Sequence, residues 1–461
     1  MFKIQFLLLP LFFSIQTLAQ AKNNVEQFKT HSPFWQALEV EKQALEKQYQ
    51  AMDLEVATQF NLELIHFTDD RKALLVLPVK QEELFLSANI SKYFSTGTRL
   101  EFLTNTTSTE YRTLPGTNHL GSFQLSLSQN LWRDFFGQGD DIRRKRNLKD
   151  YELKLLQVKM NQAQLLLRFE QILWDYIAAN VELRLRQESL RRWTEIETWM
   201  RGRYKRLVAE LVDVKQISAT KILRDIQVQT VKQRLENLKN ELDQLGGDGL
   251  SNKIILTEDL LQVSQNEISK ASDAFSIETQ ILDKTAEVAE QDMLRTAENI
   301  KPDLKLSFAL GRRGIDNSAT SAWIDSYDSD HFFTQASLTF STPLDFSLLK
   351  KSSDSAKLMY EAANIRKTQS LRSARLEWTN LQGQIQEHFR RITLLRTLTK
   401  EQQDRNEAER KRFLNGRSTS LQVVTAEQDT LDTELTLRNT QASLKKLIAQ
   451  YRLFEMINTG D

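Results

Sequence analysis

The spacing of apolar residues predicts three kinds of segment in the first half of the chain. From Ser32 to Phe60 the pattern is helical, and Ser32 and Pro33 suit the N-cap and first turn of a helix. Apolar and polar residues then alternate, with breaks, over about 84–131, which predicts a pair of strands. From about 140 to 245 the helical period continues almost without interruption. A turn midway along this segment predicts a long helical hairpin.

Two parallel stripes of apolar residues run along the outgoing helix of this hairpin, each with a seven-residue repeat. The first stripe is Val158, Leu165, Ile172 and Ala179, and the second is Phe169, Tyr176, Leu183 and Leu190. Two such stripes on one helix predict packing on two sides with coiled-coil geometry.

The second half of the chain repeats the same order. After a linker over 248–271, a helical pattern leads into alternating residues over about 303–343 and then into a second helical hairpin over about 348–455. Laying the halves on each other places Tyr204 on Phe413 and Val214 on Val423. The sequence therefore predicts an internal duplication, with repeats over 22–247 and 272–461.

Two polar runs are predicted to be loops between strands. Thr104 to His119 is rich in threonine and asparagine and contains the turn signal Pro115–Gly116. Arg312 to Asp330 is equally polar and follows the first strand of the second pair.

The tip of each helical hairpin is predicted from turn chemistry. In the second half, Gly416 suits the left-handed residue that ends the outgoing helix, and Ser418 or Ser420 can cap the returning one. In the first half, Leu207 occupies the glycine position. Because a left-handed leucine costs on the order of 1 kcal/mol, we expect that turn to have a different shape.

The N-terminus predicts export. Residues 1–21 combine Lys3, an apolar run and Ala19-Gln20-Ala21, the pattern of a signal peptide cleaved after Ala21. No later segment is apolar for long enough to predict a transmembrane helix. About four strands cannot close a barrel, so a pore requires at least three copies and about twelve strands. The alternative is a soluble sheet that caps a coiled-coil rod.

Composition and charge narrow the function classes. Of 461 residues, 62 are Lys or Arg and 61 are Asp or Glu, so nothing favours nucleic-acid binding, and the absence of cysteine excludes thiolate chemistry. The five histidines are scattered, and no nucleotide-binding glycine motif occurs. The sequence therefore predicts neither an enzyme nor a cofactor site.

The order of these segments in a duplicated chain resembles the TolC family of outer-membrane channels. The most specific stretches are SQNLWRDFFGQG, IKPDLKLSFALG and the tip sequence RKRFLNGRSTSLQVVTAEQDTL. The resemblance implies a mainly α fold with β-strands, in which a homotrimer forms a twelve-strand β-barrel in outer-membrane lipid and a twelve-helix α-barrel in the periplasm. It also implies the exit duct of a tripartite efflux pump or type I secretion system, opened at its periplasmic tip by an adaptor and an inner-membrane transporter.

The resemblance also implies roles for residues near the hairpin tips. Asp213, nine residues after Tyr204, matches a position that lines the closed aperture, whereas Gln422 makes the corresponding position of the second tip neutral. A solvated charge at a helix N-terminus is the alternative for Asp213. Residues of the turns are candidates for adaptor contact, and they are Leu207, Glu210, Gly416, Arg417, Ser418 and Ser420. An exported periplasmic adaptor or coiled-coil scaffold without a pore remains the alternative function.

Aromatic residues near the predicted strand ends suit the girdles of a membrane barrel. They are Tyr111, Trp132, Phe135, Phe136, Trp323, Tyr327, Phe332 and Phe333.

Overall fold

The computed structural model describes residues 23–70, 80–111, 116–255, 258–261, 277–328 and 330–455. The predicted signal peptide and much of the predicted linker lie outside these ranges. The chain forms two compact units, which we describe separately. One unit contains the strands and comprises Ala44–Lys154 and Leu282–Lys367, and the other is helical and comprises Met1–Gln43, Leu155–Ile281 and Thr368–Asp461.

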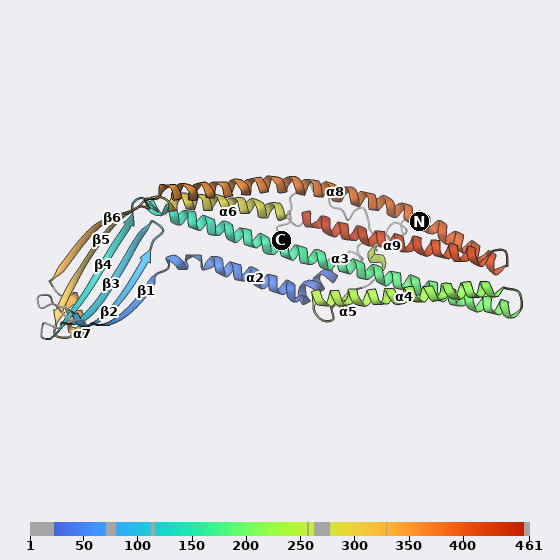
Figure 1. Cartoon of the computed structure of the whole chain (residues 1–461), viewed down its shortest axis with the longest axis horizontal. Helices are drawn as coiled ribbons and strands as arrows, with labels where there is room; N and C mark the ends of the chain where they lie inside the picture. The colour runs from blue at the N-terminus through green and yellow to red at the C-terminus, as the bar shows by residue number, and fades with distance from the viewer. Residues whose placement is uncertain are drawn as a thin grey trace, which may run out of the picture. The chain divides into compact units, whose positions relative to one another are not determined.

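A six-stranded antiparallel sheet forms the core of the strand-containing unit (Figure 1), with its strands in chain order. The strands are β1 (Gln59–Thr68), β2 (Lys80–Tyr93), β3 (Thr98–Tyr111), β4 (Thr117–Asn130), β5 (Asp303–Asp316) and β6 (Phe332–Ser341). Each of the two edge strands, β1 and β6, has one partner among the described strands. We call the end of the sheet that carries residues 68, 80, 111 and 117 its loop end.

About four strands were expected, two in each half of the chain. The described residues form six, and the first half supplies four of them. The helix expected over Ser32–Phe60 overlaps the first two residues of β1, and no element was predicted for residues 61–68, whereas helix α2 (Pro33–Gln50) and the short helix η1 (Met52–Val56) end before the strand. Within β1, Phe60, Leu62 and Leu64 alternate with polar neighbours and thus have the strand period.

The threonine-rich run was wrongly expected to be a loop as far as His119. Strand β3 extends to Tyr111, and Thr107 and Thr109 pair with Phe85 and Glu83 of β2. Threonine favours strands because its branched side chain fits a pleated surface. Polar residues on both faces of β3 removed the apolar alternation by which a strand is recognised.

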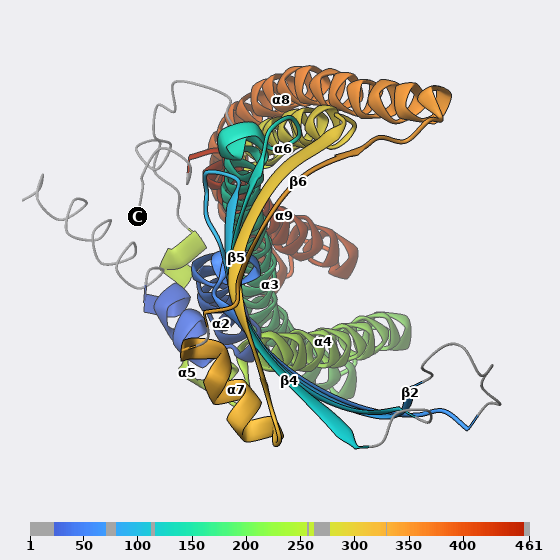
Figure 2. The ribbon, with the colours of Figure 1, turned by 90° about the vertical axis from the view of Figure 1, so that its left-hand side faces the viewer.

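The second predicted loop also contains regular structure. Strand β5 extends to Asp316, and helix α7 (Ala319–Asp328) follows it. Helix α7 packs on β3, β4 and β5. Figure 2 shows that the sheet is curved and that α7 lies on its convex side.

Long helices account for most of the remaining chain. They are α3 (Gln138–Lys205), α4 (Leu211–Gly246), α6 (Ile277–Asn299), α8 (Phe346–Leu414) and α9 (Ser420–Glu455), with the short helices η2 (Phe135–Gly137), α5 (Leu250–Lys253) and η3 (Glu258–Leu261) between them. Helix α3 has 68 residues, so the long helix predicted from its seven-residue stripes is present, and α8 in the second half of the chain has 69 residues.

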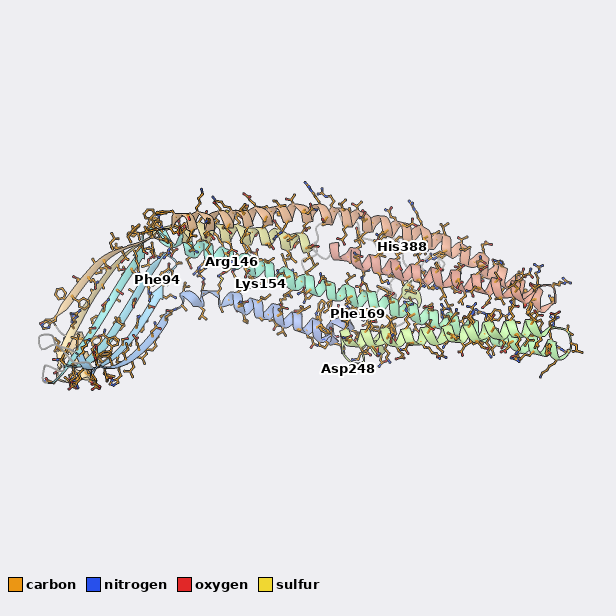
Figure 3. The ribbon with its side chains drawn as sticks, viewed as in Figure 1. Phe94, Arg146, Lys154, Phe169, Asp248 and His388 are labelled. Atoms are coloured by element: carbon orange, nitrogen blue, oxygen red, sulfur yellow. The ribbon has the colours of Figure 1, made fainter. Side chains whose placement is uncertain are left out.

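The main core of the helical unit lies along α3. Phe169 (Figure 3) is fully buried and stacks on Phe28 at a ring-centroid distance of 4.2 Å. Most residues of the two stripes are buried against neighbouring helices, but Leu183 and Leu190 are only half-buried in the single chain. These two side chains retain apolar surface for a further partner.

The start of α3 is fixed by Asp134. Its carboxylate accepts hydrogen bonds from the backbone N–H groups of Gly139 and Asp140 and from the Tyr93 hydroxyl. A Cβ on Gly137 would overlap the carbonyl oxygen of Ser95. The β2–β3 turn and the β4–α3 junction are therefore held together closely.

Among the described residues, no helix has the length and apolar character needed to cross a membrane.

Candidate functional site

The two faces of the sheet differ sharply in polarity. One row of paired residues across the six strands is Phe60, Ile90, Phe102, Leu125, Leu310 and Thr334. The adjacent row, on the opposite face, is Gln59, Ser91, Glu101, Ser126, Ala309 and Gln335. The first row belongs to an apolar face that is largely exposed to solvent in the single chain, and the second belongs to a polar face.

The apolar face is the convex one. Gly121 and Gly314 lie on it, and a Cβ on either would overlap the Ala322 carbonyl of α7. Because α7 lies on the convex side of the sheet, this face is convex and the polar face is concave (Figure 2). A sheet that is apolar outside and polar inside matches the wall of a membrane barrel around an aqueous lumen.

The two hairpin tips have the same backbone geometry. In the first tip, the N–H groups of Leu207 and Val208 donate to the carbonyls of Tyr204 and Arg203 at 2.9 and 3.0 Å. In the second, the corresponding N–H groups of Gly416 and Arg417 donate to Phe413 and Arg412 at 2.9 and 2.8 Å. This pattern closes the last turn of the outgoing helix around one left-handed residue.

The expectation that Leu207 forces a different turn is therefore wrong. Leu207 adopts φ +60°, close to the +73° of Gly416, and its side chain is 93% exposed. The strain of about 1 kcal/mol is small relative to the packing of two long helices, so the turn keeps its shape.

The returning helix of the second tip is capped by Thr419, and not by Ser418 or Ser420 as expected. The N–H of Gln422 donates to the Thr419 hydroxyl at 3.3 Å, and the Thr419 N–H donates to Gln422 Oε1 at 3.0 Å. This reciprocal pair is a capping box. In the first tip, Glu210 occupies the N-cap position without a side-chain cap.

The two tips of one chain pack against each other. The buried residues of this contact are Trp193, Ile196, Met200, Val214, Ile217, Phe413 and Val423. Trp199 lies beside Phe413 at a centroid distance of 5.0 Å, whereas Tyr204, which corresponds to Phe413 in the first tip, is 40% exposed. The tips are therefore similar in backbone but not in side-chain packing.

Asp213 takes part in this contact. Its carboxylate accepts a hydrogen bond of 3.0 Å from the hydroxyl of Ser420, the first residue of α9. Asp213 also lies in the first turn of α4, where a carboxylate is favoured by the helix dipole. Gln422 is held in the capping box of the other tip, and Glu210 and Arg417 are exposed.

A second polar contact joins the hairpins further from the tips. Arg192 donates to the Glu427 carboxylate at 2.8 Å, and Asn406 donates to the same carboxylate at 2.9 Å. The side chain of Glu427 is 6% exposed. Burial lowers the pKa of the nearby Arg224 guanidinium, while Asp432 and Glu427 oppose that shift.

Glu197 forms a further charged cluster within the first hairpin. Arg201 and Lys221 donate to its carboxylate at 2.6 and 2.9 Å, and these hydrogen bonds lower the pKa of Glu197 to about 2. The sequence did not suggest either this cluster or the contacts between hairpins, because the sequence does not show which residues of different helices face each other.

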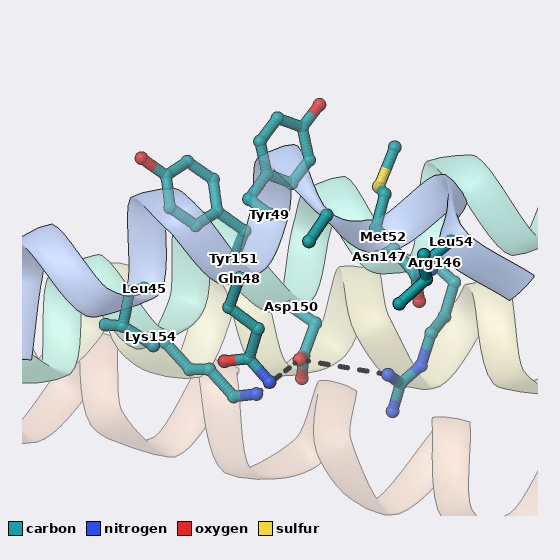
Figure 4. A pocket seen from close by; sticks show the side chains of 11 residues that line it. Leu45, Gln48, Tyr49, Met52, Leu54, Arg146, Asn147, Asp150, Tyr151 and Lys154 are labelled. Carbon is teal, nitrogen blue, oxygen red and sulfur yellow. Dashed lines mark ion pairs between the residues drawn. The ribbon is translucent and has the colours of Figure 1, made fainter. Parts of the chain in front are cut away.

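A cavity with charged groups in its wall lies in the strand-containing unit, between α2 and α3 (Figure 4). It has a volume of about 470 Å³, and Tyr49 stacks on Tyr151 at its edge with a centroid distance of 4.5 Å. Asp150 is paired with Arg146 and Lys154 in its wall. Within the described ranges, no three His, Asp or Glu side chains group as metal ligands. The charges of this cavity pair with one another and leave no evident catalytic arrangement.

Comparison with solved structures identifies the fold. VceC, an outer-membrane protein of Vibrio cholerae, matches with a TM-score of 0.71 and 15% sequence identity over 95% of this chain and 96% of VceC. CusC, described in terms of transmembrane channel formation, matches with a TM-score of 0.71 and 13% identity over 95% and 92% of the two chains. The CmeC outer-membrane channel of Campylobacter jejuni matches with a TM-score of 0.70 and 12% identity over 94% and 84%.

This chain has the fold of the TolC-family outer-membrane channels. The predicted resemblance to that family is confirmed at the level of the fold, over nearly the whole length of the chain. No protein-family model matches the sequence, and no curated protein matches it.

Proposed function

We propose that three copies of this chain form a passive channel in the outer membrane, with its helical hairpins in the periplasm. The observation that carries the proposal is the two-faced sheet, whose convex face is apolar and whose concave face is polar across all six strands. The TolC-like fold supports the same assembly. As a passive channel, it would depend on a partner for the energy of transport.

The number of strands in the proposed barrel differs from the twelve expected at first. Three copies of a six-stranded sheet supply eighteen strands if β1 of one copy pairs with β6 of the next. Both edges are available for antiparallel pairing, and closure removes the exposed edges that otherwise promote aggregation.

We further propose that the channel is the exit duct of a tripartite efflux pump or type I secretion system. A periplasmic adaptor and an inner-membrane transporter would dock at the hairpin tips and open them. Of the residues proposed for this contact, Leu207, Glu210, Gly416 and Arg417 are exposed and Ser418 is half-buried, whereas Ser420 is 8% exposed and would reach an adaptor only if its hydrogen bond to Asp213 breaks.

The channel proposal can be tested by measuring the mass of the assembly and its conductance. Native mass spectrometry in detergent should give three chains, and the purified trimer should produce stepwise conductance in planar bilayers. A monomer that remains soluble without detergent would instead favour a periplasmic adaptor or scaffold and would refute the channel.

Asp213 is the residue that we propose to line the periplasmic aperture. Three carboxylates around one axis attract cations, so Asp213→Asn should lower cation selectivity, most clearly at low ionic strength where screening is weak. Gln422→Asn, which alters the neutral position of the other tip, is the matched control and should leave selectivity unchanged. Unaltered selectivity of Asp213→Asn at low salt would remove Asp213 from the pore.

A further inference from the structure

Three hydrogen-bond donors lie buried where the two helical hairpins meet, without an acceptor among the described residues. They are the Ser189 hydroxyl and the Trp193 indole N–H of α3, and the Nε–H of Arg224 of α4. All three side chains are at most 1% exposed. Because folded proteins pair nearly all of their buried polar groups, three unpartnered donors in one region indicate that a partner from outside the chain binds there.

The helix period places the three donors at one level of the first hairpin. One face of α3 carries, at intervals of three and four residues, Arg186, Ser189, Trp193 and Glu197. At one end of this row, Arg186 donates to Gln227 of α4 at 2.9 Å. At the other end, Glu197 accepts from Lys221 of α4 at 2.9 Å. The middle of the row therefore faces the stretch of α4 that contains Arg224.

Arg224 is a buried cation whose hydrogen bonds go to neutral groups. It donates to the amide oxygen of Gln227 at 3.0 Å and to that of Gln428 of α9, which brings the second hairpin to the same place. Arg186, which is paired with Glu182, donates to the same oxygen of Gln227 and adds a second cation nearby. Burial lowers the pKa of the Arg224 guanidinium, because the charged form loses its hydration. A counter-ion at the Nε–H group would offset much of that cost.

The carboxylates around Arg224 bond to other groups. Glu427 accepts from Arg192 at 2.8 Å, and Asp432 accepts from Gln428 at 2.7 Å. Both oppose the lowering of the Arg224 pKa, so they are close enough to attract the guanidinium. Within the part of the chain that the structure describes, neither of them is hydrogen-bonded to it. The acceptor for the Nε–H group must therefore come from solution.

The chemistry of the three donors favours an anion over water. The Nε–H of Arg224 and the indole N–H of Trp193 can only donate. A water molecule that accepted from all three groups would exceed its two lone pairs, and it would also need acceptors for its own protons. A halide ion accepts hydrogen bonds from several directions and donates none, and its charge offsets that of Arg224.

We propose that Ser189, Trp193 and Arg224 bind a chloride ion. The ion would neutralise the buried guanidinium and hold α3 against α4 at the level where Gln428 joins the second hairpin. This inference goes beyond the proposed channel and depends only on the packing of the helical unit. The presence or absence of conductance therefore does not decide it.

Bromide is the probe that distinguishes a halide from water. In crystals of the full-length protein soaked in sodium bromide, an anomalous difference peak should lie between Trp193 Nε1 and Arg224 Nε. Density without an anomalous signal at this place would show a water molecule and would overturn the proposal.

Thermal unfolding measures the same site in solution. The melting temperature of the wild type should rise by about 2–4 °C as sodium chloride replaces sodium gluconate at constant ionic strength, because a ligand that binds only the folded state stabilises it. Trp193→Phe keeps the ring and removes the N–H group, so it should raise the chloride concentration at half-effect at least about tenfold. Ser189→Ala removes another donor and should act in the same direction.

Trp199→Phe is the matched control, because Trp199 lies on the same helix beside Phe413 and its indole N–H is not one of the buried unpartnered groups. It should keep the chloride response of the wild type. An equal response of the wild type, Trp193→Phe and Ser189→Ala would place the ion elsewhere and overturn the proposal. A wild-type melting temperature that does not change with chloride would overturn it as well.

Discussion

Leu207 is a residue in an unfavourable backbone conformation at a position where glycine would be free of strain. Its φ of +60° is held by the same pair of turn hydrogen bonds that surrounds Gly416. Because its side chain is 93% exposed, burial in the single chain does not offset the strain. A large exposed apolar side chain kept at such a cost is consistent with a docking role.

Leu207→Gly should therefore stabilise the isolated protein. Removal of the left-handed strain should contribute about 1 kcal/mol, reduced by the greater flexibility of glycine in the unfolded chain. Thermal unfolding in detergent measures this change. Gly416→Ala is the converse variant and should destabilise by a similar amount. A lower melting temperature for Leu207→Gly would show that the leucine makes stabilising contacts in the assembled protein.

Glu197 gives a prediction for acid stability. Hydrogen bonds from Arg201 and Lys221 depress its pKa to about 2, below the value near 4.3 of an unfolded chain. The resulting stability is present above pH 4.3 and is lost as the pH falls toward 2. Glu197→Gln should cost on the order of 1 kcal/mol at neutral pH, after screening around the exposed Arg201, and should flatten the decline between these values.

The measurement is the melting temperature as a function of pH. Glu188→Gln, which removes a carboxylate that is 50% exposed on the same helix, controls for the loss of a surface charge. An acid decline that is equally steep in Glu197→Gln and in the wild type would contradict the prediction.

At the scale of elements, the contact between the two hairpins includes the buried carboxylate of Glu427. It is held by Arg192 at 2.8 Å and by Asn406 at 2.9 Å. Arg192→Met should lower the melting temperature, because it leaves a buried charge without its cation. In a double-mutant cycle, Glu427→Gln should recover part of the loss, with a coupling of about 1–3 kcal/mol. Additive effects would show that the ion pair does not couple the hairpins.

The sequence was informative for elements whose period extends over many residues. Helices α3 and α8, with 68 and 69 residues, each continue a helical pattern over about nineteen turns, so their presence and length could be predicted. Strand β1 has only ten residues directly after a helical pattern, and β3 is polar on both faces in its second half. In neither strand was the alternation of apolar and polar residues clear enough to distinguish it from the helix or loop predicted beside it.

The candidate site was predictable only in part. The position of both tips and the left-handed Gly416 followed from local turn chemistry. The capping role of Thr419 was available in the same pattern, since Gln422 stands three residues after it. The bond between Asp213 and Ser420 was not predictable, because it joins residues 207 apart through the docking of two hairpins.

At the scale of the whole molecule, the half-buried stripe on α3 bears on assembly. Leu183 and Leu190 keep apolar surface exposed in the single chain, and a neighbouring copy would cover it in the proposed trimer. Leu183→Asp should then shift native mass spectra from trimer toward monomer, since a charge would be buried without a partner. Gln187→Asp, at an exposed position of the same helix, should leave the trimer intact. A stable Leu183→Asp trimer would place this surface outside the interface.

The six-stranded sheet has a consequence for the electrical behaviour of the proposed pore. Barrel diameter grows roughly in proportion to strand number, so eighteen strands enclose a lumen about half again as wide as twelve do. In a conduit whose segments act as resistors in series, the widest segment contributes least to the total resistance. The current through this channel would therefore depend almost entirely on the width of the opening at the hairpin tips. Changes to the lumen wall of the barrel, such as Ser126→Lys on the polar face, would leave the measured current nearly unchanged.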